Sequence, residues 1–129
     1  MHAEVASQTL TFLFTDIEGS SKLWEQHRQS MTEALERHDA ILRDAVESSN
    51  GEVVKTTGDG LMAVFGSPAD GVSACLEAQH GLGHEAWGQA GPLRVRMGLH
   101  VGEAAAREGD YFGPTLNRAA RIIDRKSVV

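Results

Sequence analysis

The sequence predicts one α/β domain whose sheet is largely antiparallel and carries packed helices. The first observation behind this prediction is the length, because 129 residues are enough for one domain. The second is the apolar pattern, which changes several times between strand-like alternation and the spacing of about three to four residues found on helices. The third is a Gly-Asp-Gly turn between two short predicted strands, which must therefore pair as an antiparallel hairpin.

The composition is that of an ordinary globular domain, with 41% apolar and 23% charged residues. The apolar runs are far shorter than the roughly 20 residues of a membrane span, and no signal-peptide pattern is visible. The net charge of −6 argues against a nucleic-acid partner. The single cysteine, Cys75, fits a reducing compartment, so we expect the protein to be cytoplasmic.

The first third of the chain is predicted to form a strand, a turn and a long helix. Residues Thr9–Thr15 are β-branched and aromatic, as in a buried strand, and residues 16–20 form the turn that follows. Ser30-Met31-Thr32-Glu33 has the pattern of a capping box and predicts a helix start. Asn50-Gly51 is expected to end this helix. Its predicted apolar face comprises Met31, Leu35, His38, Leu42, Ala45 and Val46.

The hairpin and a second helix follow. Its predicted strands are Glu52–Thr57 and Leu61–Phe65, with Asp59 at the tip. Pro68 is placed to open the second helix, which is expected to fade into the glycine-rich residues 81–91. The residues predicted to mark the packed face of this helix are Val72, Cys75, Leu76 and Gln79.

The last elements are a strand with one wet face and a final helix. Leu93, Val95 and Met97 alternate with two arginines, and residues 98–106 continue in extended form. Gly113-Pro114-Thr115 predicts the start of the final helix. The predicted apolar face of that helix comprises Leu116, Ala119, Ala120 and Ile123.

Two aspartates are candidate ligands of a hard divalent cation. Asp16 follows the first apolar strand and Asp59 lies at the hairpin tip, where tight turns hold carboxylates beside backbone carbonyls. Each aspartate taken alone is more typical of an ordinary turn residue than of a metal ligand. The negative net charge adds weight to the metal, because an acidic protein needs a cation to accept a phosphorylated substrate.

Four further polar residues are candidates for substrate contacts. Lys55 lies in the strand before Asp59, and Asp110 lies in the loop before the final helix. Asn117 and Arg121 are four residues apart on one face of that helix, where an arginine offers a planar fork to phosphate oxygens. For each of these residues, a solvated polar side chain without a functional role remains the alternative interpretation.

Other sequence patterns are weaker evidence for a functional site. Residues 81–86 match a G-x-G-x-x-A fingerprint, but they follow a helix and not a strand, which argues against a dinucleotide site. His80 and His84 have the spacing of a zinc pair, yet the glycines at 81 and 83 are expected to break the helix and no third ligand is evident. Ser20 and Ser21 lack a neighbouring base for nucleophilic catalysis.

Together, the segments resemble the catalytic domain of the class III nucleotidyl cyclases, the adenylate and guanylate cyclases. They occur in the order of that family and reach from Thr9 almost to the end of the chain. The segments are FLFTDIEGS (12–20), VKTTGDGLMAVF (54–65), GLHVGE (98–103) and GDYFGPTLNRAAR (109–121). The resemblance implies a ferredoxin-like, palm-type βαββαβ core.

The resemblance also implies roles for seven residues. Asp16, Asp59 and the carbonyl of Ile17 would hold two Mg²⁺ or Mn²⁺ ions. Lys55 and Asp110 would select adenine over guanine, because guanine presents the opposite donors and acceptors. Asn117 would position the ribose and Arg121 would stabilise the reacting phosphate. The implied reaction converts ATP into 3′,5′-cyclic AMP and pyrophosphate, as a step in cyclic-nucleotide signalling.

The implied assembly is a dimer with its sites at the interface. One chain would supply the aspartates, and a second copy or a related cyclase domain would supply Lys55, Asp110, Asn117 and Arg121. The alternatives are a guanylate cyclase, a non-catalytic nucleotide-sensing module, and a metal-dependent phosphatase with Asp16 as nucleophile. The phosphatase requires a second aspartate where this chain has Glu18.

Domain boundaries follow from the same resemblance. Residues 1–8 are expected to be a flank and residues 9–123 the catalytic domain, incomplete at its C-terminal end because the family continues with further strands and a basic residue for the triphosphate. Residues 124–129 read DRKSVV, which is also the translation of a widely used sequencing adapter. We therefore expect these six residues to be foreign to the natural protein.

Overall fold

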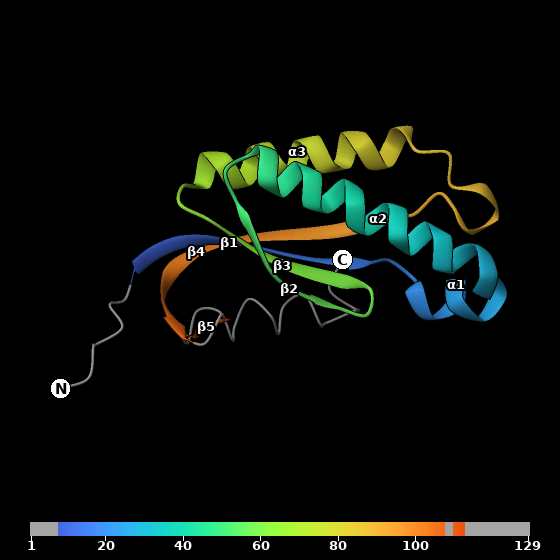
Figure 1. Cartoon of the computed structure of the whole chain (residues 1–129), viewed down its shortest axis with the longest axis horizontal. Coiled ribbons are helices and arrows are strands. Elements are labelled where there is room, and N and C mark those ends of the chain that lie inside the picture. The colour runs from blue at the N-terminus through green and yellow to red at the C-terminus, as the bar shows by residue number, and fades with distance from the viewer. Residues whose placement is uncertain (1–7, 108–109, 113–129) are drawn as a thin grey trace.

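In the computed structural model, described for residues 8–107 and 110–112, helices cover one face of an antiparallel sheet (Figure 1). The predicted order of strand, helix, two strands, helix and strand is confirmed, with α1, a short 3₁₀ helix and β5 in addition. The elements are β1 (Gln8–Ile17), α1 (Ser20–Gln26), α2 (Arg28–Ser48), β2 (Glu52–Thr57), β3 (Gly60–Phe65), α3 (Pro68–His84), η1 (Gly88–Ala90), β4 (Val95–Arg107) and β5 (Asp110–Phe112).

The sheet has the strand order β2-β3-β1-β4-β5, and each neighbouring pair is antiparallel. β1 is therefore flanked by the hairpin strand β3 and by β4. Its register places Thr15 opposite Leu61 and Asp16 opposite Arg96. The end of β1, the hairpin tip and the start of β4 consequently meet at one end of the sheet.

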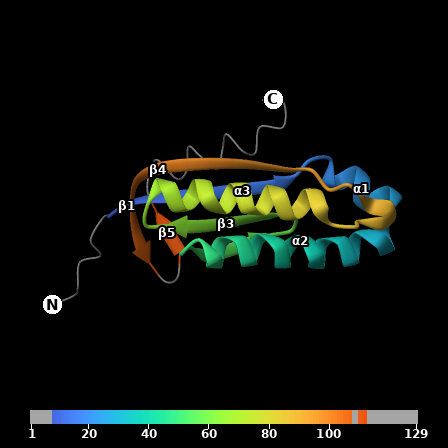
Figure 2. The same cartoon turned by 90° about the horizontal axis from the view of Figure 1, so that it is seen from above.

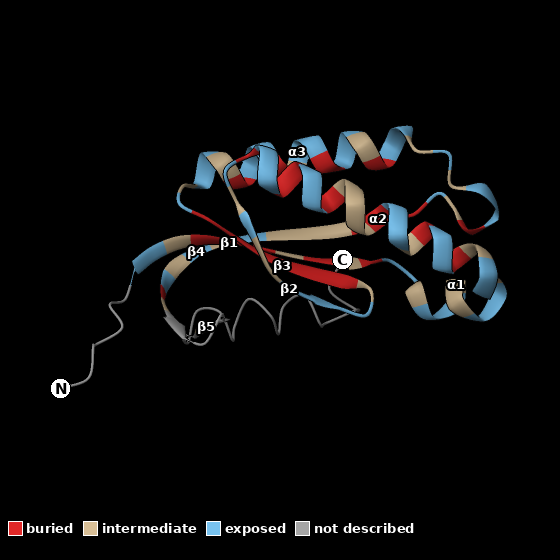
Figure 3. Ribbon diagram, in the orientation of Figure 1, coloured by how far each residue is buried: buried red, intermediate tan, exposed pale blue. Residues whose placement is uncertain are grey.

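The main core lies between the sheet and the helices. α2 and α3 run side by side over the same face, as seen from above (Figure 2). Leu13 and Ile17 of β1 pack there against Met31 and Leu42 of α2, all at most 2% exposed. β3 is buried at every position, because it lies inside the sheet with apolar side chains on both faces (Figure 3).

The start of α2 differs from the prediction. The helix begins at Arg28, and its N-cap His27 makes no side-chain capping bond, so Ser30 lies inside the helix. The reason is the one-residue connection from α1, in which the His27 N–H donates to the Leu23 carbonyl and the Met31 N–H donates to the His27 carbonyl. The chain thus turns directly from one helix into the next, and the capping box predicted at Ser30 is wrong.

The buried face of α3 also differs from the prediction. Val72 and Leu76 are 48% and 68% exposed, whereas the buried residues are Gly71, Ala74, Ala78 and Leu82. Small residues face the sheet because α3 packs closely on it: a Cβ at Gly71 would lie 2.9 Å from Cγ2 of Thr11. A pattern that favours large apolar residues cannot find such a face.

α3 continues through its glycines to His84, so the expected break at residue 81 is wrong. Leu82 holds this last turn, because its side chain is buried and its carbonyl accepts a hydrogen bond from Nε1 of Trp87. His80 and His84 therefore do share a helical face, with ring centroids 4.2 Å apart. In the part of the chain that the structure describes, no third His, Cys, Asp or Glu joins them in a possible metal cluster.

The predicted final helix, with Asn117 and Arg121, lies outside the described residues. Among residues 8–107 and 110–112, the structure has no helix with the length and apolar character that crossing a membrane requires.

Candidate functional site

The two candidate metal ligands, Asp16 and Asp59, line one cavity. Asp16 is the penultimate residue of β1, and Asp59 lies in the turn between β2 and β3. The cavity has a volume of about 330 Å³. Its lining residues are Asp16, Ile17, Glu18, Gly19, Ser20, Ser21, Asp59 and Arg96. The fold thus brings together two carboxylates that are 43 positions apart (59 − 16) in the sequence.

Two glycines allow the hairpin tip, and with it Asp59, to lie close to the end of β1. Gly60 begins β3 directly after Asp59, and a Cβ there would clash with the backbone carbonyl oxygen of Thr15. The hairpin tip therefore lies against the end of β1 only because residue 60 has no side chain. Gly19 has φ of +67°, a left-handed conformation that favours glycine, and it turns the chain from β1 into α1.

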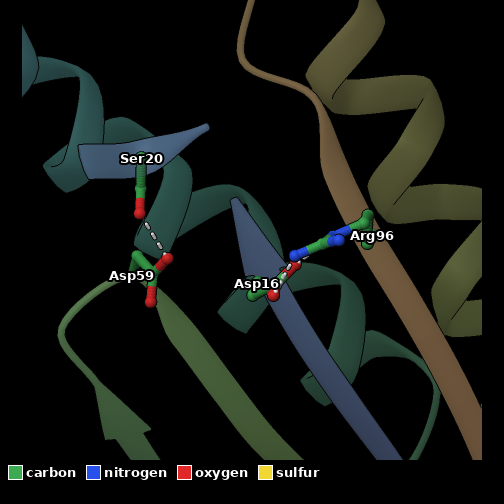
Figure 4. Close-up of polar contacts among 4 residues, drawn as sticks. All are labelled: Asp16, Ser20, Asp59 and Arg96. Carbon is green, nitrogen blue, oxygen red and sulfur yellow. Dashed lines mark hydrogen bonds and ion pairs between the residues drawn. The ribbon is translucent and has the colours of Figure 1, made fainter. Parts of the chain in front are cut away.

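Arg96 binds the carboxylate of Asp16 with two hydrogen bonds (Figure 4). Its Nε donates to Oδ1 at 2.8 Å and its Nη2 donates to Oδ2 at 2.6 Å. The side chain of Arg96 is 29% exposed and that of Asp16 is 15% exposed. Hydrogen bonding to Asp16 raises the pKa of the Arg96 guanidinium above its ordinary value, and the nearby charges of Glu18 and Asp59 add to the effect.

Asp59 has a neutral partner instead. Oγ of Ser20, the first residue of α1, donates a hydrogen bond of 2.6 Å to Oδ2 of Asp59 (Figure 4). This bond joins the start of α1 to the hairpin tip. It fixes the direction of the Asp59 carboxylate without neutralising its charge.

The residues around the cavity fit a divalent cation such as Mg²⁺ or Mn²⁺. Mg²⁺ in proteins is held by one or two carboxylates, and it completes its shell with water and substrate phosphates. Asp16 and Asp59 supply the carboxylates; Glu18 lines the cavity too, but among the described residues it does not complete a group of three that could hold a metal ion. Ile17 also lines the cavity, and the residue as a whole is 2% exposed.

Of the other predicted site residues, Lys55 is the one whose side chain the structure describes. Lys55 lies on β2, exposed and opposite Met62, outside the lining of the cavity. Asp110 begins β5 opposite Arg107, and its side chain is outside what the structure describes. Asn117 and Arg121 also lie outside the described residues.

Sequence reasoning missed two residues of the site, Arg96 and Ser20. The sequence pattern places Arg96 on the wet face of its strand and offers Ser20 only as a nucleophile without a base. The alternation in residues 93–97 did show that Arg96 projects from one face of a strand. Only the pairing of β4 with β1 shows that Asp16 lies opposite it.

Comparison with known proteins shows similarity to one protein family. The family model described as "Adenylate and Guanylate cyclase catalytic domain" matches residues 3–126. An adenylate cyclase of the fungus Mycosarcoma maydis is 35% identical, over 88% of this chain and 6% of that protein. An uncharacterised protein of Mycobacterium tuberculosis is 33% identical, over 90% of this chain. The chain spans 39% of the length of this mycobacterial relative.

Solved structures of similar fold agree with this result. A structure of adenylate cyclases from Trypanosoma brucei in their monomeric state has a TM-score of 0.80 and 27% identity, over 88% of this chain and 67% of that one. An adenylate/guanylate cyclase/hydrolase from Silicibacter pomeroyi has a TM-score of 0.74 and 28% identity, over 92% of this chain and 71% of that one. The predicted fold class is therefore confirmed.

Proposed function

Because the chain belongs to the adenylate and guanylate cyclase catalytic domain family, we propose that it is an adenylate cyclase domain that acts as a homodimer. The proposed reaction converts ATP into 3′,5′-cyclic AMP and pyrophosphate for signalling in the cytoplasm. The observation that carries the proposal is the cavity lined by both Asp16 and Asp59. We take residues 9–123 as the catalytic domain.

Asp16, Asp59 and the carbonyl of Ile17 are the proposed ligands of two Mg²⁺ or Mn²⁺ ions. When bound, the ions would lower the pKa of the ribose 3′-hydroxyl and neutralise charge along the triphosphate. The chain's own contribution is to keep both carboxylates at one end of the sheet. Three strand ends do this, because β1, β3 and β4 are held in register by antiparallel pairing.

Positive side chains would bind the triphosphate. Arg96 lines the cavity, where its planar guanidinium suits two phosphate oxygens at once. Arg121 is proposed to stabilise the phosphate that reacts, and Asn117 to position the ribose so that its 3′-hydroxyl attacks the α-phosphorus in line. These residues hold and orient the substrate, which is the larger part of catalysis in phosphoryl transfer.

Lys55 and Asp110 are the proposed adenine-selecting pair. The ammonium group would donate to N1 of adenine, and the carboxylate would accept from the exocyclic amine. Guanine has a donor at N1 and an acceptor at the exocyclic position, so both protein groups would be left unpaired. This complementarity is why we propose ATP, and not GTP, as substrate.

The experiment is turnover of Mn²⁺-ATP, and in parallel Mn²⁺-GTP, by the purified chain, with chromatographic identification of the products. We expect cyclic AMP and pyrophosphate, and little product from GTP. Asp59→Asn should abolish product, because the amide cannot replace an anionic metal ligand. Asp44→Asn is the matched control, since this aspartate is exposed on α2.

Each alternative has its own outcome. Release of inorganic phosphate would favour the phosphatase, and preferred turnover of GTP would favour the guanylate cyclase. A chain that is folded by circular dichroism and binds Mn²⁺-ATP without forming product would favour the nucleotide-sensing module. Any of these three results would contradict the proposed adenylate cyclase.

A further inference from the structure

Both carboxylate oxygens of Asp16 have the same positively charged partner. Arg96 occupies both carboxylate oxygens, Oδ1 at 2.8 Å and Oδ2 at 2.6 Å. An arginine–carboxylate pair with two hydrogen bonds is among the stronger polar contacts in proteins. A metal ion that binds Asp16 would share a carboxylate oxygen with the positively charged guanidinium, so the two cations repel each other and compete for one carboxylate.

The acidity of the site explains why an arginine belongs there. Asp16, Glu18 and Asp59 all line the cavity, and Arg96 is the positively charged residue in its lining. Without a cation, the three carboxylates would repel one another. Arg96 is held by β4 directly opposite Asp16, so it can neutralise the site without moving the backbone.

We propose that Arg96 is an exchangeable counter-ion of Asp16, which occupies this carboxylate in the metal-free site and releases it when a divalent ion binds. The inference rests on the proposed function, in which Asp16 is a metal ligand. One consequence is that Arg96 lowers the affinity of the site for metal alone. A second is that metal ion and a phosphate anion should assist each other, because an anion gives the released guanidinium a new partner.

The first test measures Mn²⁺ binding to the nucleotide-free chain, from the electron paramagnetic resonance signal of free Mn²⁺. Arg96→Ala should bind Mn²⁺ at least about fivefold more tightly than the unmodified chain, because the competitor is gone. Arg96→Lys, which keeps the charge but loses the fork, should fall between the two. A merely structural role for Arg96 would weaken Mn²⁺ binding or leave it unchanged.

Arg94→Ala is the matched control. It removes the same charge two positions earlier on the chain, from an exposed residue outside the cavity lining. Its effect on Mn²⁺ affinity should stay below about twofold, because screening by salt weakens the field of an exposed charge. Equal effects of Arg94→Ala and Arg96→Ala would overturn the exchange and show a general effect of net charge.

A second readout follows Arg96 itself. In the ¹⁵N-labelled chain, the Nε–H resonance of Arg96, assigned by its loss in Arg96→Lys, should shift as Mg²⁺ is added. The shift should saturate together with metal binding, because release from Asp16 changes the hydrogen bond of that N–H group. A resonance that stays in place while Mg²⁺ binds would overturn the proposal even if Arg96→Ala failed to fold.

Asp16→Asn separates failure of this inference from failure of the proposed function. If Asp16→Asn binds Mn²⁺ as the unmodified chain does, Asp16 is no metal ligand and both proposals fall. If Asp16→Asn loses Mn²⁺ binding while Arg96→Ala does not tighten it, the exchange alone is wrong. Loss of binding in Asp16→Asn together with tighter binding in Arg96→Ala supports both.

Discussion

At the scale of single residues, the two aspartates of the site differ in what holds them. Asp16 is neutralised by the guanidinium of Arg96, whereas Asp59 keeps its charge and accepts one hydrogen bond from the hydroxyl of Ser20. In the proposed exchange, a metal ion displaces the partner of Asp16, whereas it can bind Asp59 while Ser20 remains in place. Ser20 is thus a positioning residue for the proposed metal site.

Ser20→Ala tests this positioning. We expect Mn²⁺ to bind about tenfold more weakly, since residues that orient a metal ligand typically contribute 10- to 100-fold to affinity. Ser21→Ala is the matched control, because Ser21 lines the same cavity and differs in lacking the Asp59 bond that the structure gives to Ser20. Mn²⁺ titration of both variants checks the expectation. Equal loss in both, or none in Ser20→Ala, would contradict it.

How far the site was predictable depends on what each residue needs to be recognised. Asp16 and Asp59 could be proposed from sequence, because each follows or interrupts a strand in a recognisable turn. Arg96 and Ser20 could not, because their importance arises from partners that are 80 and 39 positions away. Strand register and helix placement bring such pairs together, and neither can be predicted from the local sequence pattern.

At the scale of elements, the hairpin of β2 and β3 places Asp59 beside β1. The close approach depends on Gly60, where a Cβ would clash with the Thr15 carbonyl oxygen and also lie 3.0 Å from Oγ1 of Thr57. Thr15 directly precedes Asp16, and Gly60 directly follows Asp59. Any side chain at position 60 must therefore push the two proposed metal ligands apart.

Gly60→Ala should lower the free energy of unfolding by about 1–3 kcal/mol, the usual range for overpacking, and should also reduce Mn²⁺-dependent activity. Gly66→Ala is the matched control: a Cβ there meets nothing within 4 Å, and φ is not left-handed. Its stability should change by less than about 1 kcal/mol. Urea unfolding and turnover of both variants check this. A Gly60→Ala chain as stable and active as Gly66→Ala would refute the argument.

Elements were predictable from sequence where large apolar residues mark the buried face. β1, the hairpin and the face of α2 near Met31 and Leu42 have such residues, and they agree with the structure. The buried face of α3 is made mainly of glycine and alanine, which carry little hydrophobic signal. Close packing on the sheet selects small residues there, so large ones such as Leu76 face outward.

At the scale of the whole molecule, the cavity is small for the proposed substrate. Its volume of about 330 Å³ is at the lower end of the range of about 300–1,000 Å³ for small-molecule sites. Its lining holds the proposed metal ligands but not Lys55. The described part of one chain thus presents the proposed metal half of a site, which supports the proposal that a second copy supplies the remainder.

Mixing two inactive variants tests this division of the site. Asp16→Ala damages the metal half and Arg121→Ala the other half, so a mixed dimer keeps one intact site of its two. Random exchange of equal amounts gives half mixed dimers, and activity should return to about a quarter of the unmodified value. Asp16→Ala mixed with Asp59→Ala is the matched control and should stay inactive, because every site then lacks a metal ligand. The measurement is turnover by the mixtures, with dimer exchange confirmed by a mass tag. Mixed dimers without activity would show that each chain carries its whole site.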